Sequence, residues 1–274
     1  MKVRFAAAAI MLTLAVTVLG ILATALVSGA DGQDLGYMKD AKYLTSGKCK
    51  MCHKGKYTAW AATKHATNAD AVPPAGSPPE QIYRYVTGFN SADGSCAEKG
   101  TACEACHGPG SAHFAAGMDT KKTVILNPDN LTTEGQKTSL CGRCHGQYTI
   151  GDKHYADGFL PGTDLFKIDG FKLDAIVPDK PMQQLNEMAG SKHFANGVVC
   201  YTCHITHGDN AQEHLLRQPI VDLCLGCHSD KNKVHDAPDV IASLAAHQPN
   251  APAGATCATC HMPQGAHTFA VPGK

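Results

Sequence analysis

The apolar residues of this chain form one long run near the N-terminus and, after residue 30, only short amphipathic patches. Residues 5–27 carry no charged side chain. Further along, Tyr57, Ala61 and His65 recur at helical spacing in YTAWAATKHA, and Val240, Leu244 and His247 do so in DVIASLAAH. The stretch 184–194 (QLNEMAGSKHF) also predicts a helix. The pattern therefore predicts a mainly α fold of short helices with extensive loops and little β structure.

The N-terminal run is typical of a secretory signal peptide over residues 1–30. Lys2 and Arg4 precede the apolar stretch, and Ser28-Gly29-Ala30 offers a small-residue cleavage site. An uncleaved N-terminal anchor is the alternative, because about 20 apolar residues are enough to span a bilayer. Both interpretations predict that the rest of the chain is exported to the periplasm or the cell exterior, with membrane association through residues 5–27 in the second.

The composition of the exported part argues for a core that protein side chains do not fill alone. Without Lys2 and Arg4, the 24 basic residues of the chain become 22 against 24 acidic ones, and no basic tract indicates a nucleic-acid partner. The chain has 27 glycines, 15 prolines and one tryptophan. Such a sequence struggles to bury enough apolar surface by itself.

The cysteines change this picture, because twelve of the thirteen fall into C-x-x-C pairs that are each followed by histidine. The six motifs are Cys49-x-x-Cys52-His53, Cys103-x-x-Cys106-His107, Cys141-x-x-Cys144-His145, Cys200-x-x-Cys203-His204, Cys224-x-x-Cys227-His228 and Cys257-x-x-Cys260-His261. Only Cys96 is left over. It is interpreted as a free or buried thiol, with an intermolecular disulfide as the alternative.

C-x-x-C-H is the attachment signature of c-type haem. Residues i, i+3 and i+4 share one face of a helical turn, so two thiols can bond the porphyrin vinyl groups while the histidine reaches the iron. Zinc sites also use C-x-x-C pairs, but they do not require histidine at the fifth place every time. A thioredoxin-like dithiol needs a single motif near a βαβ pattern, which is absent. The sequence predicts six covalently bound haems c.

Nine histidines remain after the six proximal ones, and six irons could each take one as a sixth ligand. The preferred distal ligands are His65, His113, His193, His207, His247 and His267. Their settings are short helices with a histidine on the apolar face, or positions close to a motif. His154, His214 and His235 lie in polar or loop-like settings and rank second. For His113, a turn at Gly108-Pro109-Gly110 favours a haem other than the one at Cys103.

The spacing of the motifs suggests two lobes. Residues 31–150 would carry haems 1–3, residues 191–274 would carry haems 4–6, and the haem-free stretch 151–190 would bridge them. Because haems must stack across the lobes, we expect one continuous fold with the haems as its core.

Several stretches resemble the bacterial multihaem cytochromes c related to tetrahaem cytochrome c, hydroxylamine oxidoreductase and octahaem tetrathionate reductase. They are, in chain order, CKMCHKGKYTAWAATKHA, CEACHGPGSAH, ILNPDNL, CGRCHGQ, FLPGTDL, SKHFANGVVCYTCHITHG, LLRQPIVDLCLGCH and GATCATCHMP. The resemblance covers nearly all of the exported chain. It implies distal roles for His65, His113, His193, His207 and His247, whereas the stretch around His267 (CHMPQGAHTF) departs from the family's tail.

Three functions are then weighed, and the resemblance implies that the family contains the first two of them. The first is an electron carrier with low-spin bis-histidine haems, which serves anaerobic or extracellular respiration between redox protein partners. The second is a reductase or oxidase of a small nitrogen or sulfur compound at one open haem. Family enzymes often replace a proximal histidine by lysine, and no C-x-x-C-K occurs, so no catalytic residue is assigned. The third is a homo-oligomer or filament. Haem propionates would make the holoprotein acidic, which favours partners with basic docking faces.

Overall fold

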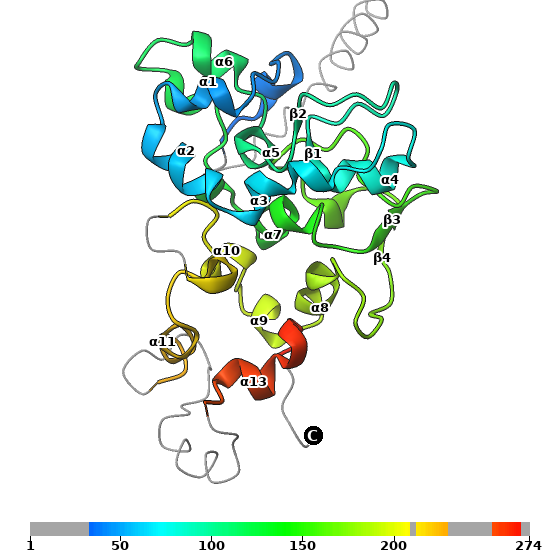
Figure 1. Ribbon diagram of the computed structural model, residues 1–274, viewed down its shortest axis with the longest axis vertical. Coiled ribbons are helices and arrows are strands. Elements are labelled where there is room, and N and C mark those ends of the chain that lie inside the picture. The colour runs from blue at the N-terminus through cyan, green and yellow to red at the C-terminus, as the bar shows by residue number, and fades with distance from the viewer. Residues whose placement is uncertain (1–32, 209–211, 230–253, 270–274) are drawn as a thin grey trace, which may run out of the picture. The chain divides into compact units, whose positions relative to one another are not determined.

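Short helices joined by loops make up most of the chain that the computed structural model describes, namely residues 33–208, 212–229 and 254–269 (Figure 1). The signal or anchor segment 1–30, the helix expected at 239–247, His235 and His247 lie outside these residues. The described residues belong to one compact unit. In the described part, no helix has the length and apolar character needed to cross a membrane.

Within these residues the helices are short and four brief strands accompany them, which confirms the expected mainly α architecture with little β structure. The α-helices are α1 (Ser46–Lys50), α2 (Lys54–Ala61), α3 (Lys64–Thr67), α4 (Pro79–Ile82), α5 (Cys103–His107), α6 (Ser111–Ala115), α7 (Glu134–Gly142), α8 (Gln184–Ala189), α9 (Lys192–Ala195), α10 (Cys200–Cys203), α11 (Ile220–Leu225) and α13 (Cys257–His261). Strand β1 (Val86–Thr87) pairs antiparallel with β2 (Glu98–Lys99), and β3 (Tyr148–Ile150) pairs antiparallel with β4 (Phe171–Leu173).

Two stretches that each predict a single helix form two helices instead. In the first, Thr63 adopts an extended backbone (φ −92°, ψ 160°) and separates α2 from α3. In the second, Ser191 (φ −87°, ψ 155°) separates α8 from α9 and accepts a hydrogen bond from the backbone N–H of Phe194. A β-region residue that precedes a helix is the usual N-cap conformation. The second helix of each pair therefore begins one residue before a histidine, His65 or His193.

The haem-free stretch 151–190 packs with earlier parts of the chain into an apolar core, which the spacing of the motifs does not predict. It centres on the β3–β4 hairpin, where Tyr83, Tyr148, Leu165 and Leu185 are buried and several phenylalanines pack around them. A second cluster buries Met38, Leu126, Leu131 and Leu140. Aromatic side chains bury large areas each, so few of them are needed to build such a core. The haems therefore cannot be the whole core of this fold.

Glu104 ties three segments of the N-terminal region together. Its carboxylate is 2% exposed and accepts backbone N–H hydrogen bonds from Leu44 (2.9 Å), Thr45 (2.8 Å) and Gly110 (2.7 Å). A buried carboxylate is tolerated when several hydrogen bonds satisfy it. This residue therefore fixes the chain that enters α1 and the turn that leads to α6 against helix α5.

Candidate haem-binding sites

The six C-x-x-C-H motifs occupy helix ends in an alternating order. In the first, third and fifth motifs, the first cysteine lies near the C-terminal end of a helix (α1, α7 and α11). In the second, fourth and sixth, it is the first residue of a helix (α5, α10 and α13). In the first and third motifs, the N–H of His53 (2.9 Å) and of His145 (2.8 Å) donates to the carbonyl of the cysteine four residues earlier. Each histidine therefore follows its cysteines in one helical turn, as the attachment chemistry requires.

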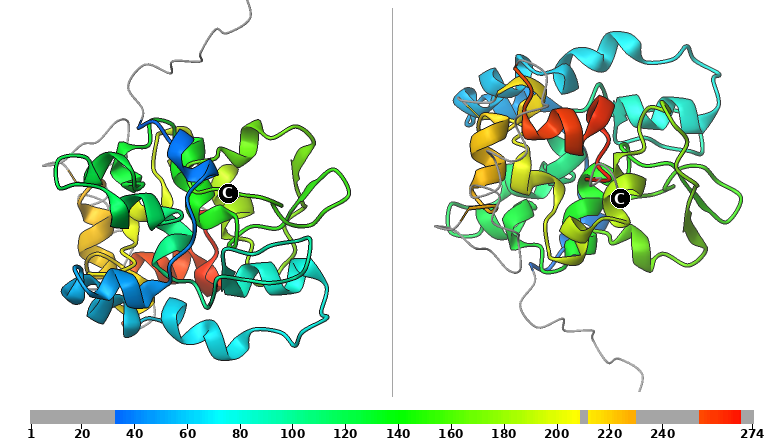
Figure 2. Two further views of the ribbon diagram at one scale, coloured as in Figure 1. Left: turned by 90° about the horizontal axis from the view of Figure 1, so that it is seen from above. Right: turned by 90° about the horizontal axis from the view of Figure 1, so that it is seen from below.

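Motifs of the two kinds lie against each other in pairs. Helix α1 contacts α5, α7 contacts α10, and α11 contacts α13, the last pair visible side by side in Figures 1 and 2. In each pair the first cysteines interact through their thiols: Cys49 with Cys103, Cys141 with Cys200, and Cys224 with Cys257. None of the thirteen cysteines is in a disulfide, and the half-buried Cys96 is free. The middle contact joins a motif before the segment 151–190 to one after it. We keep the division into two lobes as a prediction.

Five proximal histidines each face another histidine ring across a similar gap. The ring centroids are separated by 6.1 Å for His53 and His113, 6.0 Å for His145 and His65, 6.0 Å for His107 and His207, 5.8 Å for His228 and His193, and 6.1 Å for His204 and His267. All five second members are among the distal ligands that the sequence predicts. The sixth preferred residue, His247, lies outside the described residues.

This separation fits a metal held between two imidazoles. Metal–imidazole bonds of about 2.0–2.1 Å on opposite sides place two ring centroids roughly 6 Å apart. In the described part of the chain, no three His, Cys, Asp or Glu side chains converge as a tetrahedral zinc site requires. The residues therefore fit the two axial positions of a haem iron.

Hydrogen bonds to the ring nitrogen Nδ1 orient several of these imidazoles. The Nδ1 atoms of His107, His113 and His204 lie 2.7, 2.8 and 3.0 Å from the backbone carbonyl oxygens of Leu126, Lys121 and His214. The Nδ1 atom of His145 lies 3.3 Å from the side-chain oxygen of Gln184. A metal-bound histidine typically donates its other N–H to such an acceptor, which fixes the ring. Sequence reasoning missed these acceptors, because backbone carbonyls leave no signal in the residue pattern.

Burial favours the neutral form that a metal ligand needs. Burial, with His145 nearby, lowers the pKa of His65 to about 4. Burial likewise lowers the pKa of His107, His145, His193, His204 and His267. A neutral imidazole keeps a nitrogen lone pair available for a metal, whereas an imidazolium does not.

The described histidines that the sequence ranks second as distal ligands lie outside these ring pairs. His154 is exposed in the loop after β3. The side chain of His214 is 81% exposed and lies 3.5 Å from the carboxylate of Glu213. Neither faces a proximal histidine in the described ring pairs. His214 instead contributes its backbone carbonyl to the Nδ1 atom of His204.

Comparison with known proteins gives one family match and two similar solved structures. Residues 192–233, which include the fourth and fifth motifs, match the family model described as the doubled CXXCH motif. The crystal structure of the outer cell wall cytochrome OcwA is similar, with a TM-score of 0.60 and 17% sequence identity over 83% of this chain and 79% of that one. The fold is that of a multihaem cytochrome.

A second solved structure, the undecahaem cytochrome from the S-layer of Carboxydothermus ferrireducens, gives a TM-score of 0.44 at 20% identity, over 84% of this chain and 52% of that one. No curated protein matches the chain. The doubled motif and the fold together support a multihaem c-type cytochrome that binds haem c and transfers electrons. A closer relation to tetrahaem cytochrome c, hydroxylamine oxidoreductase or octahaem tetrathionate reductase stays a prediction.

Proposed function

We propose that the protein is an exported hexahaem c-type cytochrome that carries electrons along a row of bis-histidine haem sites. The observation that carries this proposal is the set of five histidine pairs with centroids 5.8–6.1 Å apart, each containing one proximal histidine. Two protein ligands on an iron leave no position for a substrate, which favours electron transfer over catalysis. For the sixth site, His261 would take His247 as its partner.

The order of the sites along the row follows the order of the motifs in the sequence. Thiol contacts join the first site to the second, the third to the fourth, and the fifth to the sixth. Between these pairs, Cys106 interacts electrostatically with Cys144, and Cys203 with Cys227. The cysteines of each motif therefore lie close to the cysteines of the next motif. Because cysteines bond the porphyrin edge, neighbouring sites would present their edges to each other.

The two ends of the row are the most open to solvent. Cys52 in the first motif and Cys260 in the last are exposed, whereas the other motif cysteines are half-buried. Bound haem supplies an iron that cycles between the ferric and ferrous states. The protein side chains hold each iron, exclude water from the middle sites, and leave the terminal sites accessible to an electron donor and an acceptor.

The cellular setting is part of the proposal. The similar proteins are described as cytochromes of an outer cell wall and of an S-layer. Together with the signal-like segment 1–30, this supports an exported protein of the periplasm or cell exterior that serves anaerobic or extracellular respiration with redox protein partners. Assembly of several copies, up to a filament, is compatible with a row whose two ends are exposed.

The test combines haem stoichiometry with iron spin state in the purified holoprotein. Mass spectrometry of the denatured protein should show six covalent haems, and electron paramagnetic resonance of the oxidised protein should show only low-spin ferric signals. Fewer haems would overturn the count. A high-spin signal from one haem would overturn the all-bis-histidine row and favour the reductase alternative.

A further inference from the structure

The first haem site differs from the others in the charge of its surroundings. Residues 41–69 contain six lysines and no acidic residue, although the whole chain has equal numbers of basic and acidic residues. The lysines that flank the first motif are all exposed; they are Lys48, Lys50, Lys54 and Lys56. We call these four residues the lysine face. Cys52 and His53 are exposed between them.

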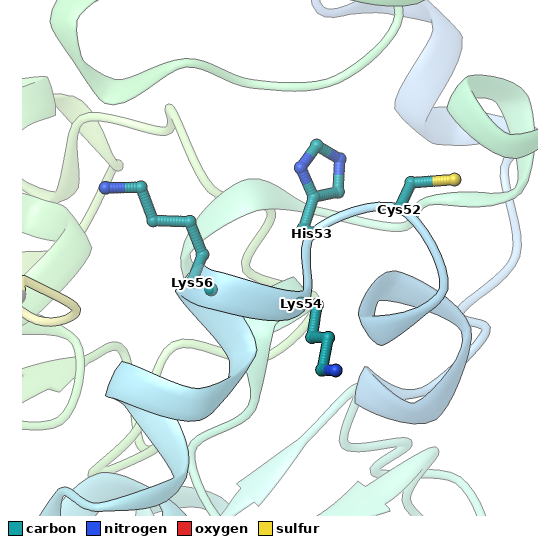
Figure 3. Close-up of a pocket in the computed structure, with 5 residues that line it drawn as sticks. Cys52, His53, Lys54 and Lys56 are labelled. Atoms are coloured by element: carbon teal, nitrogen blue, oxygen red, sulfur yellow. The ribbon is translucent and has the colours of Figure 1, made fainter.

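Figure 3 shows two residues of the lysine face, Lys54 and Lys56, beside the motif. Cys52, His53, Lys54, Gly55 and Lys56 line an open hollow, with the imidazole of His53 and the side chain of Lys54 on opposite sides of the chain. Within the described residues, neither Lys54 nor Lys56 takes part in an ion pair. Lys48 and Lys50 instead lie over the rings of Phe114 (6.0 Å) and Tyr57 (4.8 Å). Within the described residues, no ion pair therefore neutralises the charges of the lysine face.

Exposed apolar side chains accompany the lysines. Met51 is 68% exposed, and Phe114, whose ring centroid lies 6.0 Å from the Nζ atom of Lys48, is 49% exposed. Met51 lies inside the first motif, and Phe114 follows His113, which faces His53. A haem bonded to Cys49 and Cys52 would cover part of this surface. The ammonium groups, which are strongly hydrated, would stay at its rim.

The last motif, at the other end of the row, lies in a stretch of sequence without lysines. Residues 254–269 contain no charged residue at all. The described stretches around the two exposed motif cysteines thus differ in charge. A protein that approaches with an acidic surface would be attracted to the first end, because a cluster of like charges concentrates the field locally.

We propose that the lysine face is the docking surface through which an acidic redox protein exchanges electrons with the first haem. The inference rests on the proposed function, since it requires a haem at the first motif. It also refines the expectation that haem propionates make the whole holoprotein acidic and favour basic partners. The four lysines of the lysine face outnumber the two propionates of one haem. This end therefore stays basic while the molecule as a whole becomes acidic.

The test measures docking and electron transfer with a defined acidic probe, the fully reduced form of an acidic flavodoxin. Stopped-flow reduction of the oxidised holoprotein should be fast at low ionic strength and slow steeply as salt is added. Lys54→Glu/Lys56→Glu should lower the second-order rate constant at least tenfold at low salt and less than threefold at high salt. Calorimetric binding of oxidised flavodoxin should weaken in the same variant and in the same salt-dependent way.

The matched control, Lys167→Glu/Lys172→Glu, reverses the charge of two exposed lysines that lie away from the motifs. It changes the net charge equally, and its rate should stay within twofold of wild type. Equal loss in both double variants would mean that net charge alone acts, and a salt-independent wild-type rate would also overturn the proposal.

Two further readouts distinguish docking from haem loss and from self-association. Dithionite reduction and low-spin spectra check the haems in every variant, so a failure there counts against the proposed function and not against docking. If Lys54→Glu/Lys56→Glu changed only the oligomeric state in light scattering, or only the potential of one haem, the lysine face would bind a second copy or a propionate, and the proposal would be wrong.

Discussion

A single imidazole, that of His113, decides whether the first site offers two protein ligands. The chain turns at Gly108, whose φ of +77° suits glycine, and a Cβ there would meet the Met38 side chain at 2.8 Å. The turn leads into α6, and the carbonyl of Lys121 holds the Nδ1 atom of His113. This geometry explains why His113 faces His53 and not the nearer histidine in sequence, His107.

Replacing this imidazole should therefore change one iron and leave the others alone. His113→Ala should convert one of the haems from low-spin to high-spin, because the iron loses one of its two axial imidazole ligands. Electron paramagnetic resonance of the oxidised protein measures this change. His154→Ala, at an exposed histidine outside the ring pairs, is the control and should keep the wild-type spectrum. An unchanged spectrum of His113→Ala would remove His113 from the ligand set.

The buried phenol of Tyr148 makes stability depend on alkaline pH. Its hydroxyl donates to the carbonyl of Arg143 (2.8 Å) and lies 3.0 Å from the hydroxyl of Tyr83. Burial raises the pKa of Tyr148 to about 12. An unfolded chain ionises tyrosine near pH 10, so the folded state keeps its full stability below about pH 10 and loses it as the pH rises toward 12.

Tyr148→Phe should flatten this part of the stability profile. We expect the variant to lose about 1 kcal/mol at pH 7, where the Arg143 carbonyl loses its donor. Between pH 10 and 12 its further loss should be smaller than that of wild type, by an amount on the order of 2–3 kcal/mol. Urea unfolding at several pH values measures both effects. Parallel profiles for the two proteins would contradict the assignment.

At the scale of elements, Glu104 links the chain before α1, helix α5 and the turn into α6. Three backbone N–H groups donate to its carboxylate. Glu104→Gln replaces one acceptor oxygen by a donor, which leaves at least one buried N–H facing an N–H₂ group. We expect a loss of about 1.5–3 kcal/mol in the free energy of unfolding. Glu134→Gln, at an exposed carboxylate in the first turn of α7, should cost less than about 1 kcal/mol. Similar losses in both variants would show that the buried contacts are weak.

Helix α8 packs against the third motif through glycine. A Cβ on Gly146 would lie 2.6 Å from the carbonyl oxygen of Gly142 and 2.8 Å from Leu185, a residue of α8. Gly146→Ala should therefore push α8 away and cost about 1–3 kcal/mol in chemical denaturation. Gly55→Ala is the opposite case, because nothing lies within 4 Å of its Cβ position in α2. It should gain about 0.5–1 kcal/mol. The reverse order of the two effects would contradict this packing.

The sequence predicts the elements better than their breaks and partners. The apolar spacing that places His65 and His193 on helices is right, but Thr63 and Ser191 each break the predicted helix, and spacing alone does not detect that break. The sequence contains the six motifs and the five histidines that face them, and both can be identified there. The sequence does not show which histidine faces which motif, since His207 lies against His107 and His267 against His204 through contacts between distant segments. The lysine face was visible as a charge bias, and it became informative only once the exposure of Cys52 was known.

At the scale of the whole molecule, the histidine pairs connect parts of the chain that are remote in sequence. His65 near the N-terminal end faces His145 in the third motif, and His193 before the fourth motif faces His228 in the fifth. An iron between two such residues would act as a cross-link. A bond between remote segments favours the folded state, because metal binding to a site that exists only after folding adds its free energy to folding.

The C-terminal segment 254–269 offers the clearest case of such a cross-link. His267 brings it to His204 in the fourth motif, with ring centroids 6.1 Å apart. A second contact, from the backbone N–H of His267 to the buried carboxylate of Glu187 (2.7 Å), does not depend on the imidazole. The segment is therefore held to the middle of the chain by one contact that needs iron and by others that do not, among them the ring contact of Phe269 with His193 (4.0 Å).

His267→Ala separates the two contacts. It should give one high-spin haem and, because the iron cross-link is lost while the Glu187 contact remains, faster but not complete proteolytic loss of residues 254–269 from the holoprotein. Mass spectrometry of timed digests, together with electron paramagnetic resonance, measures both. Thr268→Ala, at an exposed neighbour, should match wild type in each. Faster digestion with every haem still low-spin would mean that His267 holds the segment by packing alone and is not an iron ligand.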